Sequence, residues 1–200
     1  MSIFDDIFVH EVYEKRYRMH SGNGVLDIGA HQGWFTKKAA EMVGDAGWVW
    51  AFEPEPKNYE ALLERVRSYD NVRATRAAVW RYGGERFTLY RDSRNDGAHS
   101  IVYKPDEGGD SVTVDGLAID ALPIKRRVNF IKIDAEGAEY EIIRGASNLI
   151  ATNRPHIAME IHGQEVWKKI KQWFEGMHYL LEPDTDVNGW VAYATPLPRP

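Results

Sequence analysis

The stretch VLDIGAHQGWF, residues 25–35, carries an acid and two glycines at a spacing that suits a ligand site. Gly29 and Gly33 permit a tight turn and a close approach of the backbone to a ligand. The free amide groups at the start of the helical pattern that follows, near Thr36, favour an anionic group. Asp27 stands where its carboxylate would serve a cationic amine. We therefore expect a pocket for a small charged ligand at this turn.

A second acid, Glu53, ends the next strand-like run, about 25 residues after Asp27. In open α/β sheets an acid at this place accepts hydrogen bonds from the two hydroxyls of a ribose. The two acids and the glycine turn together predict a nucleoside site. The spacing D-x-G-x-x-x-G lacks the third glycine of the dinucleotide pattern, and no Tyr-x-x-x-Lys pair stands near the expected active strand. An NAD(P)-dependent oxidoreductase of Rossmann type is therefore only an alternative.

Four side chains that can move a proton follow two later apolar runs. Asp134 and Glu136 come after the run FIKI, and Glu160 and His162 belong to the stretch HIAMEIHG. Because the carboxyl ends of parallel strands meet at one edge of a sheet, we expect these groups beside the glycine turn. Asp134, Glu136 and His162 are the candidate catalytic residues. His162 is the preferred base, since an imidazole titrates nearest to working pH.

The same acids permit a different interpretation, a metal site. Asp134, Glu136 and Glu160 would hold a hard divalent cation such as Mg²⁺, which orients two substrate oxygens. Glu139 is interpreted as an ordinary acid at a helix N-terminus, where the helix dipole favours it. His99 and Ser100 lie in a turn-rich loop that either covers a substrate or is simply exposed.

Short apolar runs alternate with helical patterns along most of the chain. The alternation predicts βαβ units with right-handed crossovers and a mainly parallel sheet that helices cover on both faces. The ligand site then lies beyond the carboxyl ends of the strands. The predicted strands span residues 24–28, 48–52, 72–79, 128–133 and 157–161, and the predicted helices span residues 33–43, 56–69, 138–150 and 164–177.

Three regions depart from this alternation of strands and helices. Residues 85–91 and 111–114 read as short strands around a polar loop, in which Asn-Asp-Gly at residues 95–97 favours a turn. The C-terminal part alternates apolar and polar residues about a turn near residues 188–189, which predicts an antiparallel hairpin at one sheet edge. Residues 1–23 are expected to form an N-terminal helical extension.

The composition excludes several classes of protein. The 200 residues are 44% hydrophobic and include seven tryptophans, enough for one sizeable core, so we expect a single domain over residues 1–200. The net charge of −5 and the lack of a long basic run argue against a nucleic-acid partner. No cysteine is present, which excludes disulfides and thiolate metal sites. No apolar run approaches membrane-spanning length, so we expect a soluble, cytoplasmic protein; its oligomeric state is left open.

Four stretches together resemble the successive motifs of the FkbM-type methyltransferases, a branch of the class I S-adenosylmethionine-dependent family. They are VLDIGAHQGWFT, FEPEPKNYEALLERV, IKIDAEGAEYEIIRGA and HIAMEIHG, and the resemblance covers roughly residues 25–163. The third, with its Lys-Ile-Asp-x-Glu-Gly order, is the most specific. The resemblance implies a Rossmann-like three-layer α/β sandwich with a mostly parallel seven-stranded sheet of order 3-2-1-4-5-7-6. It also implies methyl transfer, usually to a hydroxyl oxygen.

The resemblance places the cofactor and the reaction on the residues named above. Asp27, Glu53 and the acids Asp134 and Glu136 match the family's motifs, whereas His31 stands where the family often has Asn. The expected acceptor is a small molecule or a sugar; transfer to nitrogen, including a protein lysine, and a binding module without catalysis are the alternatives. The residues expected to bind S-adenosylmethionine are Asp27, Gly29, His31, Gly33, Thr36, Glu53, Pro54 and Ala78.

Overall fold

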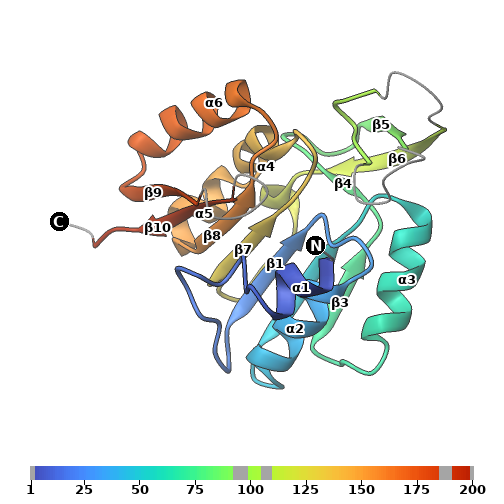
Figure 1. The fold of residues 1–200 in the computed structure, drawn as a ribbon, viewed down its shortest axis with the longest axis horizontal. Coiled ribbons are helices and arrows are strands. Elements are labelled where there is room, and N and C mark those ends of the chain that lie inside the picture. Colours follow the sequence, from blue (N-terminus) through green and yellow to red (C-terminus); the bar gives the residue numbers. More distant parts are fainter. Residues whose placement is uncertain (1–2, 92–98, 105–109, 185–190, 199–200) are drawn as a thin grey trace.

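The computed structural model describes residues 3–91, 99–104, 110–184 and 191–198. Within these ranges the strands form a seven-stranded and a three-stranded sheet (Figure 1). The strands are β1 (Gly24–Ile28), β2 (Trp48–Phe52), β3 (Val72–Thr75), β4 (Ala78–Val79), β5 (Arg86–Tyr90), β6 (Ser111–Leu117), β7 (Phe130–Ile133), β8 (His156–Glu160), β9 (Tyr179–Asp184) and β10 (Val191–Pro196).

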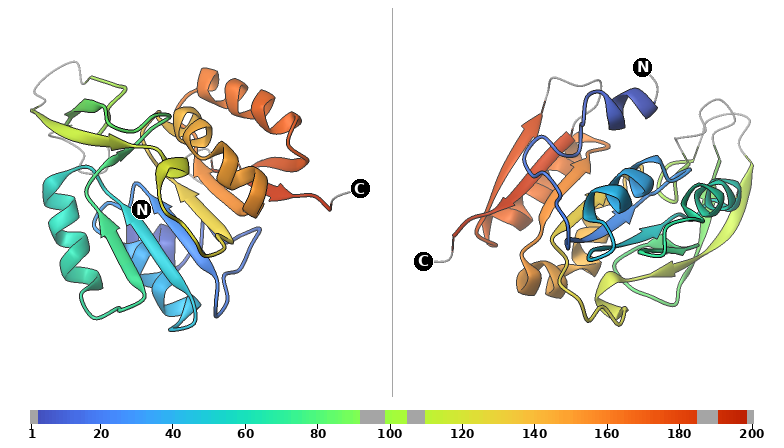
Figure 2. Two further views of the ribbon diagram at one scale, coloured as in Figure 1. Left: turned by 180° about the vertical axis from the view of Figure 1, so that it is seen from behind. Right: turned by 90° about the horizontal axis from the view of Figure 1, so that it is seen from below.

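The helices cover both faces of the larger sheet, and Figure 2 shows the two layers from other sides. None of the described helices has the length and apolar character needed to cross a membrane. The helices are α1 (Ile3–Phe8), α2 (Trp34–Val43), α3 (Pro56–Val66), the 3₁₀ helix η1 (Ile119–Ala121), α4 (Glu139–Gly145), α5 (Ser147–Asn153) and α6 (Gln164–Glu175).

The larger sheet has the strand order β3-β2-β1-β7-β8-β10-β9. β1 pairs in parallel with β2 and β7, and β10 pairs antiparallel with both of its neighbours, β8 and β9. Numbered within this sheet alone, the order is 3-2-1-4-5-7-6, as the resemblance implied. The chain order reverses between β1 and β7, so the carboxyl ends of these two strands border the crevice in which such sheets bind ligands.

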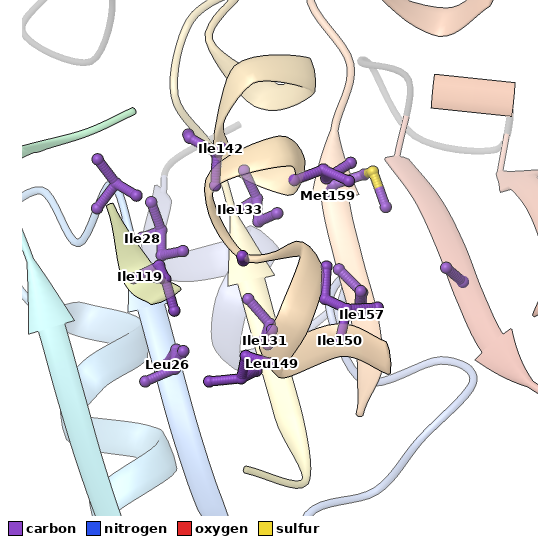
Figure 3. Close-up of a cluster of buried hydrophobic side chains, with 14 of the residues drawn as sticks. Leu26, Ile28, Ile119, Ile131, Ile133, Ile142, Leu149, Ile150, Ile157 and Met159 are labelled. Carbon is purple, nitrogen blue, oxygen red and sulfur yellow. The ribbon is translucent and has the colours of Figure 1, made fainter. Parts of the chain in front are cut away.

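Side chains of β1 alternate between two apolar layers. Leu26 and Ile28 pack in the layer of α4, α5 and α6, whereas Val25 packs in the layer of α2. Complete burial of one side chain of this size contributes about 1.5–3 kcal/mol, so strands that are apolar on both faces suit this position. Figure 3 shows the first layer, with Leu26, Ile28, Ile119, Ile131, Ile133, Ile142, Leu149, Ile150, Ile157 and Met159.

The N-terminal segment is less helical than expected. Only the six residues of α1 are helical, and residues 9–23 contain neither helix nor strand. The segment instead inserts single side chains, Val12, Tyr13 and Met19, into the α2 layer. These side chains anchor a stretch of the chain that has no second helix.

Lys38 of α2 binds this segment to the helix layer on that face of the sheet. Its Nζ donates a hydrogen bond to the carbonyl oxygen of Ile7 at 2.8 Å and lies 2.5 Å from Oε2 of Glu14. The Tyr193 hydroxyl of β10 donates to the carbonyl oxygen of Val12. The N-terminal segment and β10 therefore meet on the same face of the sheet.

The predicted strand over residues 72–79 is divided in the structure. Residues 72–75 form β3 in the larger sheet, while Ala78 and Val79 form β4 and pair with β6 in the smaller sheet. The smaller sheet has the order β4-β6-β5, and its β5–β6 pair is antiparallel. The predicted short strands over residues 85–91 and 111–114 are confirmed as β5 and β6.

The C-terminal hairpin is confirmed by the antiparallel pairing of β9 and β10. The turns predicted at residues 95–97 and 188–189 lie outside the described residues.

The predicted helix over residues 138–150 is divided into α4 and α5 at Ala146. Gly145 stands at the break, packed directly against the backbone of Trp80. A Cβ atom at Gly145 would lie 2.2 Å from the Trp80 carbonyl oxygen. The chain changes direction where only glycine fits.

Replacing Gly145 with alanine is expected to lower the free energy of unfolding by about 1–3 kcal/mol, because the new methyl group overpacks a contact with backbone. Urea denaturation measures the change. The control is Gly176→Ala, since no atom lies within 4 Å of a Cβ added at Gly176 and its φ is −87°. Equal free energies for the two variants would contradict the prediction.

Candidate functional site

A cavity of about 300 Å³ lies at the carboxyl ends of β1, β2 and β7. The turns after these strands supply a large part of its wall, and residues of β4, β8, the N-terminal segment and the helices α2, α3 and α4 supply much of the rest. The residues supplied by the three turns include Gly29, His31, Glu53, Pro54, Asp134 and Glu136.

The turn after β1 requires glycine at two positions for backbone reasons. Gly29 has a φ of +75°, and a Cβ atom there would lie 1.7 Å from the Asp134 carbonyl oxygen. Gly33 has a φ of +82°, and a Cβ atom added there would clash with Leu62 of α3. The turn therefore packs against both β7 and α3, and His31, itself at a φ of +50°, reaches the cavity.

Asp27 lies behind the wall of the cavity rather than in it. Its Oδ2 accepts a hydrogen bond from the Thr36 hydroxyl at 2.5 Å, and its Oδ1 lies 3.5 Å from Nζ of Lys132. Burial raises the pKa of Asp27, while Lys132 and Thr36 act in the opposite direction. Among the described residues, Asp27, Gly33 and Thr36 are not part of the cavity lining. Asp27 Oδ2 is engaged by Thr36, whereas the buried Oδ1 accepts no hydrogen bond from any residue that the structure describes; direct contact of Asp27, Gly33 and Thr36 with a ligand stays a prediction.

Lys132 of β7 is one cavity residue that sequence reasoning missed. It pairs in register with Asp27, and its Nζ lies 3.5 Å from Asp134 Oδ2 and donates to the Gly29 carbonyl oxygen. Burial acts to lower its pKa, but the carboxylates of Asp27 and Asp134 raise it, and the net shift is upward. The available sequence signal was that Lys132 is the one charged residue inside the apolar run FIKI.

Glu53 and the residues around it form the other end of the cavity. The Glu53 carboxylate is 6% exposed and accepts backbone hydrogen bonds from His31 at 2.7 Å and Glu55 at 2.9 Å. Its pKa is raised to about 7, because burial outweighs these two hydrogen bonds. Pro54 and Ala78 line the same end.

His162 lies among carboxylates. Its Nδ1 is 2.7 Å from Glu139 Oε1, and its Nε2 is 3.5 Å from Glu136 Oε2 and 4.0 Å from Glu160 Oε2. Burial alone would lower the pKa of His162, but the hydrogen bond and charge of Glu139, with the charge of Glu136, raise it to about 9. The imidazole is therefore protonated at neutral pH. His162 thus differs from the ordinary imidazole on which its predicted role as base rested, and that role stays a prediction.

Glu139 does more than complement a helix dipole. Its side chain is fully buried, and Oε1 accepts hydrogen bonds from both the Gly137 backbone N–H and the His162 ring. It fixes the turn after β7 and the orientation of His162 together, because it contacts both. Sequence alone had placed it correctly at the start of a helix, but not against His162.

Glu136, Glu160 and Asp134 line the cavity, whereas His162 is absent from its described lining. The pKa of Glu136 is raised to about 7 by burial. The pKa of Glu160 is raised to about 7 first by the negative charge of Asp134 and then by burial. Two carboxyl groups that titrate near neutrality thus face the cavity.

The loop at His99 and Ser100 packs on this acidic end. The buried Ser100 hydroxyl donates to the Glu136 carbonyl oxygen at 2.7 Å and accepts from the backbone of Tyr103. The Tyr103 hydroxyl donates to the His162 carbonyl oxygen at 2.9 Å. His99 lines the cavity and Ser100 is buried, so these two residues border the site.

Asp6, Ile7 and Tyr13 of the N-terminal segment also line the cavity. Sequence reasoning missed all three, because nothing in their local pattern indicates contact with motifs more than a hundred residues further along.

The expected metal ligands are partly brought together. Asp134, Glu160 and His162 each offer one ligand atom, and these atoms lie within 4.8 Å of one another. Glu136 is not in that group. The donor set fits a divalent cation only when His162 is neutral, since a protonated imidazole cannot be a ligand.

Comparison with known proteins identifies a family over most of the chain. The family model described as the methyltransferase FkbM domain matches residues 27–181. No curated protein matches the chain.

Several solved structures share the fold. A methyltransferase FkbM from Methylobacillus flagellatus has a TM-score of 0.67 at 17% identity; the match covers 92% of this chain and 49% of that one, so this chain spans about half its length. Fibrillarin from Aeropyrum pernix with natively bound S-adenosyl-L-methionine has a TM-score of 0.58 at 14% identity, covering 95% and 74%. An S-adenosylmethionine-dependent O-methyltransferase from Thermotoga maritima has a TM-score of 0.55 at 10% identity, covering 100% and 73%.

Replacing His162 with glutamine is expected to destabilise the fold in a pH-dependent way. The pKa rises from 6.5 to about 9 on folding, so the protonated ring contributes its full stability below pH 6.5 and loses it as the pH rises through about 9. Urea denaturation should show a loss on the order of 2 kcal/mol near pH 7 that shrinks toward pH 10. The exposed His10, replaced in the same way, is the control. A loss that is the same at both pH values would contradict the prediction.

Proposed function

The chain belongs to the FkbM methyltransferase family, and on this basis we propose that it transfers the methyl group of S-adenosylmethionine to a hydroxyl oxygen of a small molecule or sugar. The observation that carries the proposal is a single cavity whose wall holds both Glu53 and the carboxylates of Asp134, Glu136 and Glu160. The cofactor supplies an activated methyl group on a sulfonium. The protein must therefore bind, align and remove one proton.

The residues at the Glu53 end fit a nucleoside. Each Glu53 oxygen accepts one backbone N–H, and an ionised carboxylate retains further lone pairs for the two ribose hydroxyls. Phe52 and Ala78 offer an apolar wall for adenine, and Pro54 borders it. In this proposal the dinucleotide alternative is set aside, because the family is a methyltransferase family.

Asp27 and Thr36 act on the cofactor indirectly. Asp27 pairs with Lys132, whose side chain lines the cavity and binds the Gly29 carbonyl oxygen. Lys132 and the turn at residues 29–31 are then the groups that meet the amino-acid end of the cofactor. This arrangement replaces the direct contact with Asp27 that the sequence suggested.

Glu136 is the proposed base. Tyr13 donates to Glu160, and Lys132 lies 3.5 Å from Asp134, so both of these carboxylates are already engaged. Among the described side chains, the contact of the Glu136 carboxylate is His162 at 3.5 Å. A carboxylate whose pKa is about 7 can accept a proton from a hydroxyl acceptor near neutral pH.

His162 becomes a positioning residue in this proposal. Its imidazolium faces Glu136 and Glu160 and offsets their repulsion, while Glu139 holds its other nitrogen. Asp134, bound to Lys132, completes the acidic wall.

Transfer to nitrogen is the second candidate, since three carboxylates in the cavity wall would attract an amine acceptor, a protein lysine included. A divalent cation at Asp134, Glu160 and His162 is an alternative to the imidazolium, because neutral His162 is required to bind it. The two states of His162 exclude each other, and chelation distinguishes them.

The cofactor assignment is tested by calorimetry with S-adenosylhomocysteine, NAD and NADP in parallel. We expect binding of S-adenosylhomocysteine on the order of micromolar and none of the dinucleotides. Glu53→Gln should weaken that binding about tenfold or more at pH 8, because hydrogen bonds to a charged group are lost. Glu60→Gln, on the exposed side of α3, is the control. Binding of a dinucleotide alone would refute the cofactor assignment.

The reaction is tested by methyl transfer from labelled S-adenosylmethionine to a panel of sugars, phenols, small alcohols, amines and a lysine peptide. For the best acceptor, Glu136→Gln should lower kcat by about 10²–10⁴-fold, because a general base is lost. The wild-type rate should rise with pH through about 7, as Glu136 loses its proton. The exposed Glu165, replaced by glutamine, is the control.

The same assay after exhaustive chelation should give an unchanged rate. Loss of activity that Mg²⁺ restores would mean that a metal ion, rather than the His162 imidazolium, lies among these carboxylates. Transfer to amines but not to hydroxyls would favour the second candidate.

A further inference from the structure

Tyr13 reaches the acidic end of the cavity from outside the matched family domain, which begins at residue 27. The Tyr13 side chain is buried, and its hydroxyl donates to Glu160 Oε1 at 2.8 Å. The same hydroxyl lies 3.4 Å from Asp134 Oδ2. One hydroxyl therefore joins the carboxylates that follow β7 and end β8.

The ring of Tyr13 is held independently of that hydroxyl. It packs edge-on against Phe35 with centroids 5.3 Å apart, and the Lys132 ammonium lies 5.4 Å from its centroid. The segment on either side is fastened by Lys38. Removal of the hydroxyl alone should therefore leave the ring in place.

The carboxylates that Tyr13 joins repel each other. Asp134, Glu136 and Glu160 face the cavity, and the nearby cations are Lys132 and His162. Lys132 is shared with the buried Asp27, so negative charge is in excess at this end. A donor placed between two of these carboxylates keeps them together on the cavity side.

Methyl transfer changes the charge that this wall meets. The acceptor oxygen bonds to the methyl carbon, the carbon–sulfur bond breaks with its electron pair on sulfur, and the acceptor proton passes to Glu136. The cationic sulfonium becomes a neutral thioether. A negative wall near the sulfur favours the reactant over the product.

We propose, on the basis of the proposed function, that Tyr13 is a positioning residue that holds Glu160 and Asp134 toward the cofactor sulfur, so that the site prefers S-adenosylmethionine to S-adenosylhomocysteine. The N-terminal segment is then part of the active site. Its contribution is to discriminate by charge between the cofactor before and after transfer.

The test is calorimetric binding of S-adenosylmethionine and S-adenosylhomocysteine, without acceptor, at about pH 8. The wild-type protein should bind S-adenosylmethionine about tenfold more tightly, and Glu160→Gln should remove most of this preference. Tyr13→Phe should reduce the preference about threefold or more. Tyr17→Phe is the control, because Tyr17 lies in the same segment and its hydroxyl donates to Asn23.

The ratio of the two dissociation constants separates positioning from simple structural support. A Tyr13→Phe protein that binds both ligands more weakly by the same factor, or that keeps the wild-type ratio, would overturn the proposal. So would a wild-type protein that shows no preference for the cationic ligand. Failure of the wild-type protein to bind either ligand would instead refute the proposed function. Thermal unfolding of each variant confirms that the fold is intact.

Discussion

The site depends on one buried ammonium group. Lys132 joins the carboxylates of Asp27 and Asp134 and the carbonyl oxygen of Gly29, and so ties the ends of β1 and β7 together. Removal of one partner from a buried ion pair costs about 3–5 kcal/mol, because a charge is left without compensation. The acid at the end of the first strand is therefore tolerable in a buried layer because a neighbouring strand supplies its counterion in register.

At the acidic end of the cavity, a second cation likewise compensates the carboxylates around it. His162 is held by Glu139 on one side and faces Glu136 and Glu160 on the other. The pKa of the imidazole rises to about 9, while the pKa values of both facing glutamates rise to about 7. The environment thus exchanges the roles that free side chains would suggest: the histidine holds its proton, and the carboxylates titrate near neutrality.

Sequence reasoning captured the fold better than the site. The bounds of β1 and β2 were obtained because short runs that are apolar on both faces report burial directly, whereas the strand order followed from the family resemblance. The break at Gly145 was missed because it reflects contact with a distant backbone. At the site, residue types and strand ends identified the acids, but pairing decides their function. The hydrogen bond of Asp27 with Thr36 and its ion pair with Lys132 cannot be read from local spacing, and Tyr13 left no signal.

The contacts of the N-terminal segment with β8 and β10 have a consequence for folding. Tyr13 contacts Glu160 across 147 residues, and Tyr193 of β10 contacts Val12 across 181. Contacts of such long range form only after a large loss of chain entropy, and they slow folding. Tyr13 can reach Glu160 only once β8 has paired beside β7 in the sheet. The part of the cavity wall that Tyr13 completes therefore forms late in folding, after segments far apart in the chain have come together.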